Sequence, residues 1–339
     1  MGESGFNFIV GIGRSGTTLL MSMLNAHPTI QATPEVNFFV FFHNSWKNKT
    51  TFKESDFKRV ELYVSLFKRR KHASGFDWSM DVFRDLIGKS PKISFAIIYQ
   101  CFYKSFIYGG TPKLITHNFD KNPINTLFLK DIIAHFPEAK FVFLVRDPRA
   151  NYLSRKEKVN FRKPNIYADS HRWAFYNENT LAVIEKYKDK FYVLKYEDLV
   201  SNAKFQLQEL SNFFGFSNEQ NMLDFHLKVK ENSLHKVIND SENVHDKAKV
   251  KYEKLSRPIN TDRLEVWKEK LSAEEIEINS SICRVANYFG YHIDDKKPKY
   301  NLLKYYRGVF LAKREIALNK IIYRTPICFK LHFANLFGR

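Results

Sequence analysis

The stretch Val10–Leu20, VGIGRSGTTLL, decides the fold of this 339-residue chain. Phe6–Val10 has the apolar run of a buried strand, and Thr17–Ala26 has the pattern of a helix that ends at His27-Pro28. A strand, a glycine-rich turn and a helix make half of a βαβ unit. Glycines let the backbone approach an anion closely, and the start of a helix favours negative charge. The stretch therefore predicts an anion-binding loop.

The loop departs from the usual nucleotide-binding sequence at one position. Gly11 and Gly16 have the spacing of the phosphate loop G-x-x-x-x-G-K-[ST], but Thr17 stands where the lysine belongs. Without that lysine the loop is poorly equipped for a γ-phosphate. Arg14 offers a planar fork of donors for an oxyanion, and the hydroxyls of Thr17 and Thr18 add to it. A purely structural turn would need only glycine, so we favour anion binding.

A second polar cluster follows a later strand. Phe141–Val145 reads FVFLV, as expected for a strand buried on both faces, and VRDPRANYLSRK continues from its last residue. Arg146 ends this strand, Pro148 starts a helix, and Ser154 lies two turns into that helix. A guanidinium and a hydroxyl there could share a phosphate, although Arg-Asp pairs at strand ends are also common salt bridges. Together with the first loop, the cluster predicts a ligand with two separated anionic groups.

Strand and helix signals alternate along the rest of the core. They comprise a strand at Phe191–Lys195, helical spacing over Pro123–His135 and over most of 35–110, a helix stop at Phe214 and Gly215, and a capping box at Ser272 and Glu275. The alternation predicts an α/β fold with a parallel sheet that binds ligands at the carboxyl ends of its strands. We expect one domain over residues 1–295.

The net charge and the cysteines indicate which binding partners and which cellular compartment to expect. The net charge is +18, so anionic partners are expected. The three cysteines show neither a pairing rhythm nor metal-ligand spacing, which favours a reducing compartment and no metal site. Without a recognised nucleic-acid motif, no nucleic-acid partner is expected. No cleavable apolar run and no stretch near the length of a membrane span is seen, so we expect a cytoplasmic location.

Residues 296–339 form a basic and apolar extension. They hold eleven Lys or Arg residues and one acid, Glu315, and so carry +10 of the net +18. Apolar and aromatic residues interleave with these charges. One interpretation is a basic amphipathic segment on an anionic membrane surface, which would place the chain peripherally at the inner face of a membrane. The other is a solvated helical face packed on the domain, and the sequence leaves both open.

Three motifs together resemble those of the sulfotransferases that use 3′-phosphoadenosine-5′-phosphosulfate. They are GRSGTTLL, FVFLVRDPRANYLS and YEDL, and the similarity covers about residues 6–295. The branch that the chain resembles contains protein-tyrosine sulfotransferases and many bacterial homologues. The resemblance implies a P-loop-like three-layer fold with a central parallel sheet flanked by helices. It also implies the sulfated nucleotide as cosubstrate and a hydroxyl-bearing acceptor.

The resemblance assigns roles to both polar clusters. In the family the first motif holds the 5′-phosphosulfate, while the strand-end arginine and the serine eight residues on hold the 3′-phosphate. The 5′ group carries over to Arg14, Ser15, Gly16, Thr17 and Thr18, and the 3′ group to Arg146 and Ser154.

Sulfuryl transfer is an in-line displacement that needs a base for the acceptor hydroxyl and a cation at the transferring group. Glu35 in ATPEVNFF lies twenty-one residues after Arg14, where the tyrosine-sulfotransferase branch has its catalytic glutamate. The structural alternative is a glutamate in the first turn of a helix. Lys121 in DKNP matches the lysine of an NKDP-like stretch, with a plain surface lysine as the alternative. Arg14 would share the sulfuryl charge.

Two histidines are weaker candidates. His117 competes for the role of base, because small-molecule sulfotransferases use a histidine before the second motif. Its spacing to Arg146 does not fit that branch, so Glu35 is preferred. His27, beside its proline, is expected to be structural.

One position departs from the branch. The tyrosine-sulfotransferase branch has a catalytic serine upstream of a KPVN-like stretch, which reads RPIN here. Counting back from Pro258 places Lys251 at that position, and Ser256 is displaced from it by five residues. Either Lys251 contacts the nucleotide or the loop is rebuilt. The departure makes peptide tyrosine a weaker acceptor candidate.

The acceptor is only outlined by the sequence. The stretch Asn37–Trp46, NFFVFFHNSW, follows Glu35 and could line an apolar acceptor channel, although such a run is more often core. Together with residues 296–339 it favours a glycolipid, a lipid-linked sugar or another lipid alcohol, and a soluble glycan stays open. Peptide tyrosine is less favoured, since no secretory signal is seen. A nucleotide-dependent kinase of the P-loop type, lacking the usual lysine, is the alternative outside this family.

Overall fold

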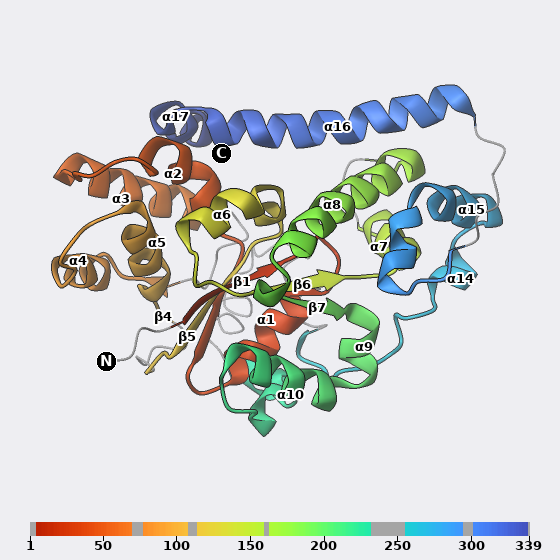
Figure 1. Cartoon of the computed structure of the whole chain (residues 1–339), viewed down its shortest axis with the longest axis horizontal. Coiled ribbons are helices and arrows are strands. Elements are labelled where there is room, and N and C mark those ends of the chain that lie inside the picture. Colours follow the sequence, from red (N-terminus) through yellow and green to blue (C-terminus); the bar gives the residue numbers. More distant parts are fainter. Residues whose placement is uncertain are drawn as a thin grey trace.

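Five parallel strands form the central sheet, in the order β2-β5-β1-β6-β7 (Figure 1). The computed structural model describes residues 5–69, 77–107, 114–158, 163–231, 255–293 and 301–337. The strands are β1 (Gly5–Val10), β2 (Ile30–Thr33), β5 (His117–Lys121), β6 (Phe141–Val145) and β7 (Phe191–Lys195). The parallel sheet is confirmed, as are the predicted strands that became β1, β6 and β7.

Strand β1 lies in the middle of the sheet, and the topology around it indicates where a ligand binds. By the edge of the sheet we mean the side formed by the carboxyl ends of the strands. Strand β1 pairs with β5 on one side and with β6 on the other. The connection from β1 leads to β2 on the first side, and the connection from β6 leads to β7 on the second. In open α/β sheets ligands bind at such a reversal, beyond the carboxyl ends of the strands. The anion-binding loop, which follows β1 directly, is therefore where the topology favours a ligand.

Helices cover both faces of the sheet, which confirms the predicted three-layer fold (Figure 1). One face carries α1 (Thr17–Ala26) and α10 (Ala203–Phe214); the other carries α2 (Phe38–Trp46), α5 (Phe95–Lys104), α6 (Leu129–His135) and α8 (Ile166–Lys186). Leu20 and Leu207 are buried with Phe119 on the first face. The second face is an aromatic layer built on Phe8 and Phe143.

The remaining elements extend these layers. They are α3 (Glu54–Arg69), β3 (Asp77–Trp78), α4 (Met80–Gly88), β4 (Phe106–Ile107), α7 (Pro148–Lys156), α9 (Tyr196–Ser201), α11 (Phe225–Glu231), α14 (Trp267–Lys270) and α15 (Ala273–Ile282), with 3-10 turns at Pro123–Phe128, Lys188–Lys190, Gln220–Met222 and Arg284–Phe289. The capping box of Ser272 and Glu275 is confirmed at the start of α15. Gly215 ends α10 in the left-handed conformation, also as predicted.

Two strands, β2 and β5, are not evident from hydropathy. Strand β5 reads HNFDK, and both Asn118 and Asp120 are buried beneath the aromatic layer. The Asp120 carboxylate accepts hydrogen bonds from the Tyr99 hydroxyl (2.5 Å) and from Asn125 Nδ2 (2.6 Å). Burial raises the pKa of Asp120 to about 7, and these hydrogen bonds oppose the rise. A strand with buried polar side chains lacks the apolar run by which β6 is recognised.

The phenylalanine-rich stretch after Glu35 forms α2 and belongs to the core. Phe38, Phe39 and Phe42 have no exposed surface. The Phe38 ring stacks on Phe42 at 4.2 Å and on Phe102 at 4.1 Å between centroids. The interpretation of this stretch as the lining of an acceptor channel is therefore wrong for these rings, because they are packed against other side chains in the core.

The C-terminal extension forms two helices, α16 (Leu302–Arg324) and α17 (Ile327–Phe337), which pack on the domain (Figure 1). Gly308 lets α16 approach α8, since a Cβ there would lie 2.5 Å from the Cβ of Tyr167. Lys330 of α17 is buried and donates hydrogen bonds to the carbonyl oxygens of Val40 and Phe41 in α2 at 2.7 and 2.9 Å. Burial lowers the pKa of Lys330 to about 8. These contacts attach α17 to the helix that follows Glu35.

A buried histidine also joins α2 to the extension. His43 is 1% exposed, its Nδ1 hydrogen-bonds the Tyr323 hydroxyl of α16, and its Nε2 lies 3.1 Å from His135 Nδ1. Burial, with a smaller contribution from His135, lowers the pKa of His43 to about 3. The folded protein therefore keeps this imidazole neutral at pH values where an unfolded chain would protonate it.

Two glycines shape the turn between β1 and α1. Gly11 has φ +137°, and a Cβ there would lie 2.3 Å from the carbonyl oxygen of Leu144 in β6. Gly16 has φ +95°, and a Cβ there would lie 2.5 Å from the Tyr196 ring. Both positions exclude a side chain on conformational and steric grounds.

We predict that His43 makes the protein acid-sensitive. Between pH 6.5 and pH 3 the unfolded chain binds a proton that the folded state excludes, so the free energy of unfolding falls as pH falls through this window. Lowering the pH from 7 to about 4.5 should cost about 2–3 kcal/mol through this group. His43→Gln should flatten the pH dependence of urea unfolding by that amount. Parallel curves for the two proteins would contradict the prediction.

We further predict that Gly11→Ala lowers the free energy of unfolding by about 2 kcal/mol or more, because the added methyl group meets backbone that cannot move aside. Gly13→Ala in the same loop is the matched control, since a Cβ there meets nothing within 4 Å and its φ is not left-handed. Urea unfolding should show the control at or slightly above wild-type stability. Equal effects of the two substitutions would be inconsistent with this account.

Candidate active site

The loop after β1 presents both backbone and side-chain donors at the start of α1. Gly16 is the N-cap of α1 and adopts the left-handed conformation, so no side chain covers the first helical turn. Thr17 begins the helix, with Thr18 next to it. Thr126 Oγ1 accepts a hydrogen bond from the backbone N–H of Gly11 at 2.9 Å and fixes the base of the loop. The start of α1 can thus bind an anion, as the sequence predicts.

The two predicted anion-binding clusters meet in the fold. The guanidinium of Arg14 donates to Ser154 Oγ from Nε at 3.0 Å and from Nη2 at 2.8 Å, although the residues are 140 positions apart. Arg146 Nη1 donates to the backbone carbonyl oxygen of Arg14 at 3.3 Å. The loop of β1 and the helix after β6 therefore form a single site.

Arg146 is a buried cation with unused hydrogen-bonding capacity. Its side chain lies over the Tyr196 ring at 4.2 Å, and Nη2 donates to the carbonyl oxygen of Arg263 at 3.3 Å. Its Nε is buried and has no hydrogen-bond partner within the described part of the chain. Burial lowers the pKa of Arg146, and burial followed by repulsion from Arg146 lowers the pKa of Arg14. A buried guanidinium at Arg146, with the more exposed cation of Arg14 in the neighbouring loop, favours an anionic ligand.

Several supporting residues are not evident from sequence alone. Asn151 of α7 donates from Nδ2 to the Gly13 carbonyl oxygen (3.2 Å) and to Ser15 Oγ (3.3 Å). Glu197, in the YEDL motif, accepts a hydrogen bond from the backbone N–H of Asp147 (3.1 Å) and from the Tyr291 hydroxyl (2.6 Å). The YEDL motif therefore supports Arg146 and the turn that follows it. The motif signals this region, but only the tertiary contacts reveal its role.

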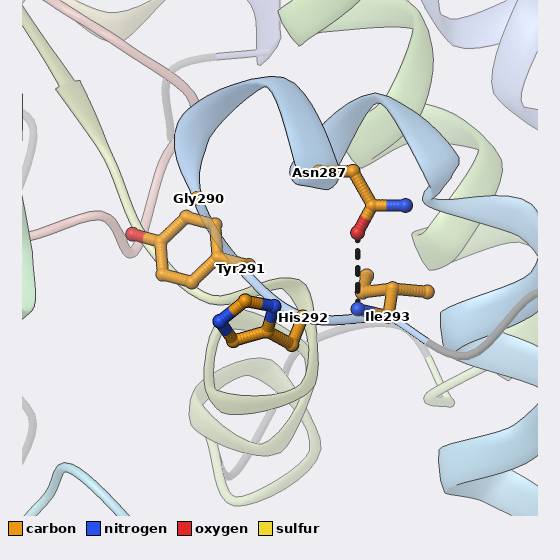
Figure 2. A pocket seen from close by; sticks show the side chains of 5 residues that line it. All are labelled: Asn287, Gly290, Tyr291, His292 and Ile293. Carbon is orange, nitrogen blue, oxygen red and sulfur yellow. Dashed lines mark hydrogen bonds between the residues drawn. The ribbon is translucent and has the colours of Figure 1, made fainter.

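An open pocket lies beyond this support, on the other side of Tyr291. It has a volume of about 360 Å³ and is lined by Asn287, Gly290, Tyr291, His292 and Ile293. Figure 2 shows it, with Asn287 Oδ1 accepting a hydrogen bond from the backbone N–H of Ile293 at 3.0 Å. None of the predicted site residues lines this pocket, so it does not form part of the candidate active site.

Glu35 and Lys121 meet at the ends of neighbouring strands. Lys121 is the last residue of β5, and Glu35 follows the end of β2 by two residues. Lys121 Nζ donates to Glu35 Oε1 at 2.8 Å, with the lysine side chain 1% exposed and the glutamate side chain 52% exposed. Asn122 Nδ2 donates to the Val36 carbonyl oxygen at 2.6 Å and fixes the segment that carries Glu35. The surface-lysine alternative for Lys121 is excluded by its burial.

Glu35 also lies near enough to the loop to influence Arg14. Its carboxylate raises the pKa of Arg14, opposing the larger effects of burial and of Arg146. The structure thus brings Arg14, Lys121 and Glu35 to one edge of the sheet.

The remaining candidate residues lie away from this site or outside the residues that the structure describes. His117 is the first residue of β5 and so sits at the opposite edge of the sheet from Lys121, about 13 Å away along the strand. It is therefore misplaced for the competing role of base. His27 is buried and bonds the Ser217 carbonyl oxygen from Nε2 at 2.9 Å, which confirms its structural role. Lys251 lies outside the described residues, and Ser256 is half-buried just after the chain resumes.

No metal centre emerges among the residues that the structure describes. No group of three or more His, Cys, Asp or Glu side chains there could hold an ion. Arg14, Lys121 and Arg146 are among the cations near this end of the sheet that an anionic ligand could meet.

The chain is similar to known proteins over most of its length. The model of the sulfotransferase family matches residues 7–220, which include both anion-binding clusters, Glu35 and Lys121. Protein-tyrosine sulfotransferase A of Caenorhabditis elegans is 23% identical over 312 residues, covering 88% of this chain and 70% of the relative. Protein-tyrosine sulfotransferase 1 of Danio rerio is 23% identical over 300 residues, covering 86% of this chain and 74% of the relative.

A solved structure shows the same fold. The sulfotransferase domain from the olefin synthase of Synechococcus PCC 7002 superimposes with a TM-score of 0.55 at 18% identity, covering 87% of this chain and 98% of that domain. With the family model matching well over half of the chain, the protein belongs to the sulfotransferase family and is a sulfotransferase.

Proposed function

We propose that the protein transfers a sulfuryl group from 3′-phosphoadenosine-5′-phosphosulfate to an acceptor hydroxyl by in-line displacement. The observation that carries this proposal is the contact of Arg14 with Ser154, together with the hydrogen bond from buried Arg146 to the Arg14 carbonyl oxygen. It unites two anion-binding clusters, as a nucleotide with phosphate groups at both ends of its ribose requires. The nucleotide supplies the activated sulfuryl group and the leaving group when bound.

The residues present fit such a ligand. Gly11 and Gly16 allow the positive φ angles that shape the loop, and the start of α1 would hold the 5′ end together with Ser15, Thr17 and Thr18. Arg146, through its unpaired Nε, and Ser154 would hold the 3′-phosphate. Arg14, which now bonds the Ser154 hydroxyl, would exchange that neutral partner for an anionic oxygen. Lys251 is a further candidate contact.

Glu35 and Lys121 would divide the proton and charge chemistry between them. The half-exposed Glu35 carboxylate can accept the proton of an incoming hydroxyl, while the buried Lys121 ammonium holds the carboxylate in place. Lys121 and Arg14 would stabilise negative charge on the transferring group and the leaving oxygen. Since the base sits beside a buried cation, its activity would derive from its position.

For the acceptor we propose a hydroxyl of a glycan, a glycolipid or another lipid alcohol. The support for a lipid-associated acceptor is the exposed surface of α16, since the phenylalanine-rich α2 is core. A peptide tyrosine is the second candidate, because the relatives above carry that activity in their names. Transfer of labelled sulfuryl to a glycolipid, a soluble glycan and a tyrosine peptide, side by side, distinguishes these classes.

The proposed nucleotide site predicts which ligand stabilises the protein. Adenosine 3′,5′-bisphosphate at about 100 times its Kd should stabilise the protein by about 2.7 kcal/mol, and ATP with Mg²⁺ much less. Ser154→Ala should weaken the bisphosphate by about 10-fold or more through loss of a charge-assisted hydrogen bond. The exposed Ser201→Ala serves as the control and should bind normally. Preferential stabilisation by ATP with Mg²⁺ would favour the kinase alternative.

The proposed role of Glu35 as base predicts how its substitution changes turnover. Glu35→Gln should lower kcat by about 10²–10⁴-fold, the usual contribution of a positioned base, and leave the bisphosphate Kd unchanged. Glu61→Gln on the exposed surface of α3 is the control for loss of a carboxylate. Donor turnover on the best acceptor and calorimetric titration measure the two quantities. If Glu35→Gln turns over at the wild-type rate, the base must be sought at another residue.

A further inference from the structure

The inner side of α16 carries the residues that attach it to the domain. Gly308, Ala312 and Tyr323 are buried against the core. Glu315 also points inward, where Arg172 Nη1 of α8 lies 3.4 Å from its carboxylate. Glu315 is the sole acid of residues 296–339. Its inward direction leaves the outer surface of α16 without a negatively charged side chain.

The outer side of α16 combines apolar and cationic groups. Leu303, Tyr306, Phe310 and Ile321 are 81%, 67%, 60% and 60% exposed. Their spacing places them on one side of the helix. Arg307 and Arg314 fall on the same side and are exposed, and the remaining exposed cations of α16 are Lys304, Lys313, Lys320 and Arg324. We call the side formed by Leu303, Tyr306, Arg307, Phe310, Arg314 and Ile321 the docking face.

The rest of the described surface exposes large apolar side chains less densely than this helix does. Of the fifteen large apolar side chains exposed within the described residues, eight lie between Leu302 and Phe329. Helix α16 has 23 residues and so extends for ~34 Å. It runs along the outside of the molecule (Figure 1), and the side chains of its docking face are exposed. A long, exposed apolar face of this kind marks an interaction site.

We infer that the docking face binds the surface of an anionic lipid bilayer, with α16 lying parallel to it. The apolar side chains can enter the boundary of headgroups and acyl chains, while the cations attract the headgroups. Within the described ranges no helix combines the length and apolar character of a membrane span. A second copy fits the face less well, because pairing would oppose like charges.

The docking face is firmly joined to the catalytic edge. Lys330 Nζ donates to the Tyr323 carbonyl oxygen at 2.9 Å as well as to carbonyls of α2, and Asn44 Nδ2 donates to the Arg324 carbonyl oxygen at 3.1 Å. Helix α2 begins three residues after Glu35. Contact with a bilayer would therefore set the orientation of the whole domain. The inference does not depend on which acceptor the enzyme uses.

Co-sedimentation of the full chain with vesicles tests the inference. The protein should bind vesicles of phosphatidylcholine with phosphatidylserine, more weakly as salt rises, and should leave pure phosphatidylcholine vesicles free. Arg307→Glu with Arg314→Glu should weaken binding by at least ~30-fold, the effect of losing two membrane-proximal cations. Leu303→Ser with Phe310→Ser should also release the protein. Lys204→Glu with Phe205→Ser, an exposed pair on α10, is the matched control and should bind normally.

Each other outcome overturns the inference. Equal binding to neutral vesicles, no binding to anionic ones, or full retention by the docking-face variants would exclude an anionic bilayer as the partner. A dimer in sedimentation velocity that these variants dissociate would assign the face to self-association, and tighter binding to RNA than to vesicles would assign it to nucleic acid. Stabilisation by adenosine 3′,5′-bisphosphate should be unchanged in all these variants, so failure here is distinguishable from failure of the proposed reaction.

Discussion

The close approach of Arg14 to the buried side chain of Arg146 is the constraint on which the site depends. Arg14 and Arg146 lose hydration, and burial lowers the pKa of each. Carbonyl oxygens, the Tyr196 ring and the Ser154 hydroxyl contact these side chains, and the carboxylates of Glu35 and Glu197 oppose the lowering without cancelling it. The fold therefore retains a strong preference for an anion between β1 and β6, and this preference defines the site better than any open cavity does.

The pairing of neighbouring strands brings together residues that are far apart in the sequence. Strands β2 and β5 are adjacent and parallel, so the residues after them meet at the same edge. This pairing brings the half-exposed carboxylate of Glu35 to the buried ammonium of Lys121. Asp120, the residue before Lys121, anchors β5 in the core through Tyr99 and Asn125. The ion pair of Glu35 and Lys121 is thus supported by buried polar contacts rather than by loops alone.

The C-terminal helices serve both the core and the surface. His43 and Lys330 bind them to α2 through buried polar contacts, and Gly308 allows close packing on α8. Their outward sides keep large apolar and cationic groups in solvent. The two interpretations that the sequence leaves open for residues 296–339 are therefore not exclusive, because a packed inner side leaves the outer side available.

The sequence by itself determined the local features: the strand, glycine turn and helix around Arg14, the buried run of β6, and the helix ends at Gly215 and Ser272. These depend on periodicity, backbone freedom and capping, which act over a few residues. Only the tertiary structure decided that α2 fills the core, that Arg14 reaches Ser154, and that Glu315 turns inward. Those outcomes depend on strand order and helix packing, which join residues far apart in the chain and leave no local pattern.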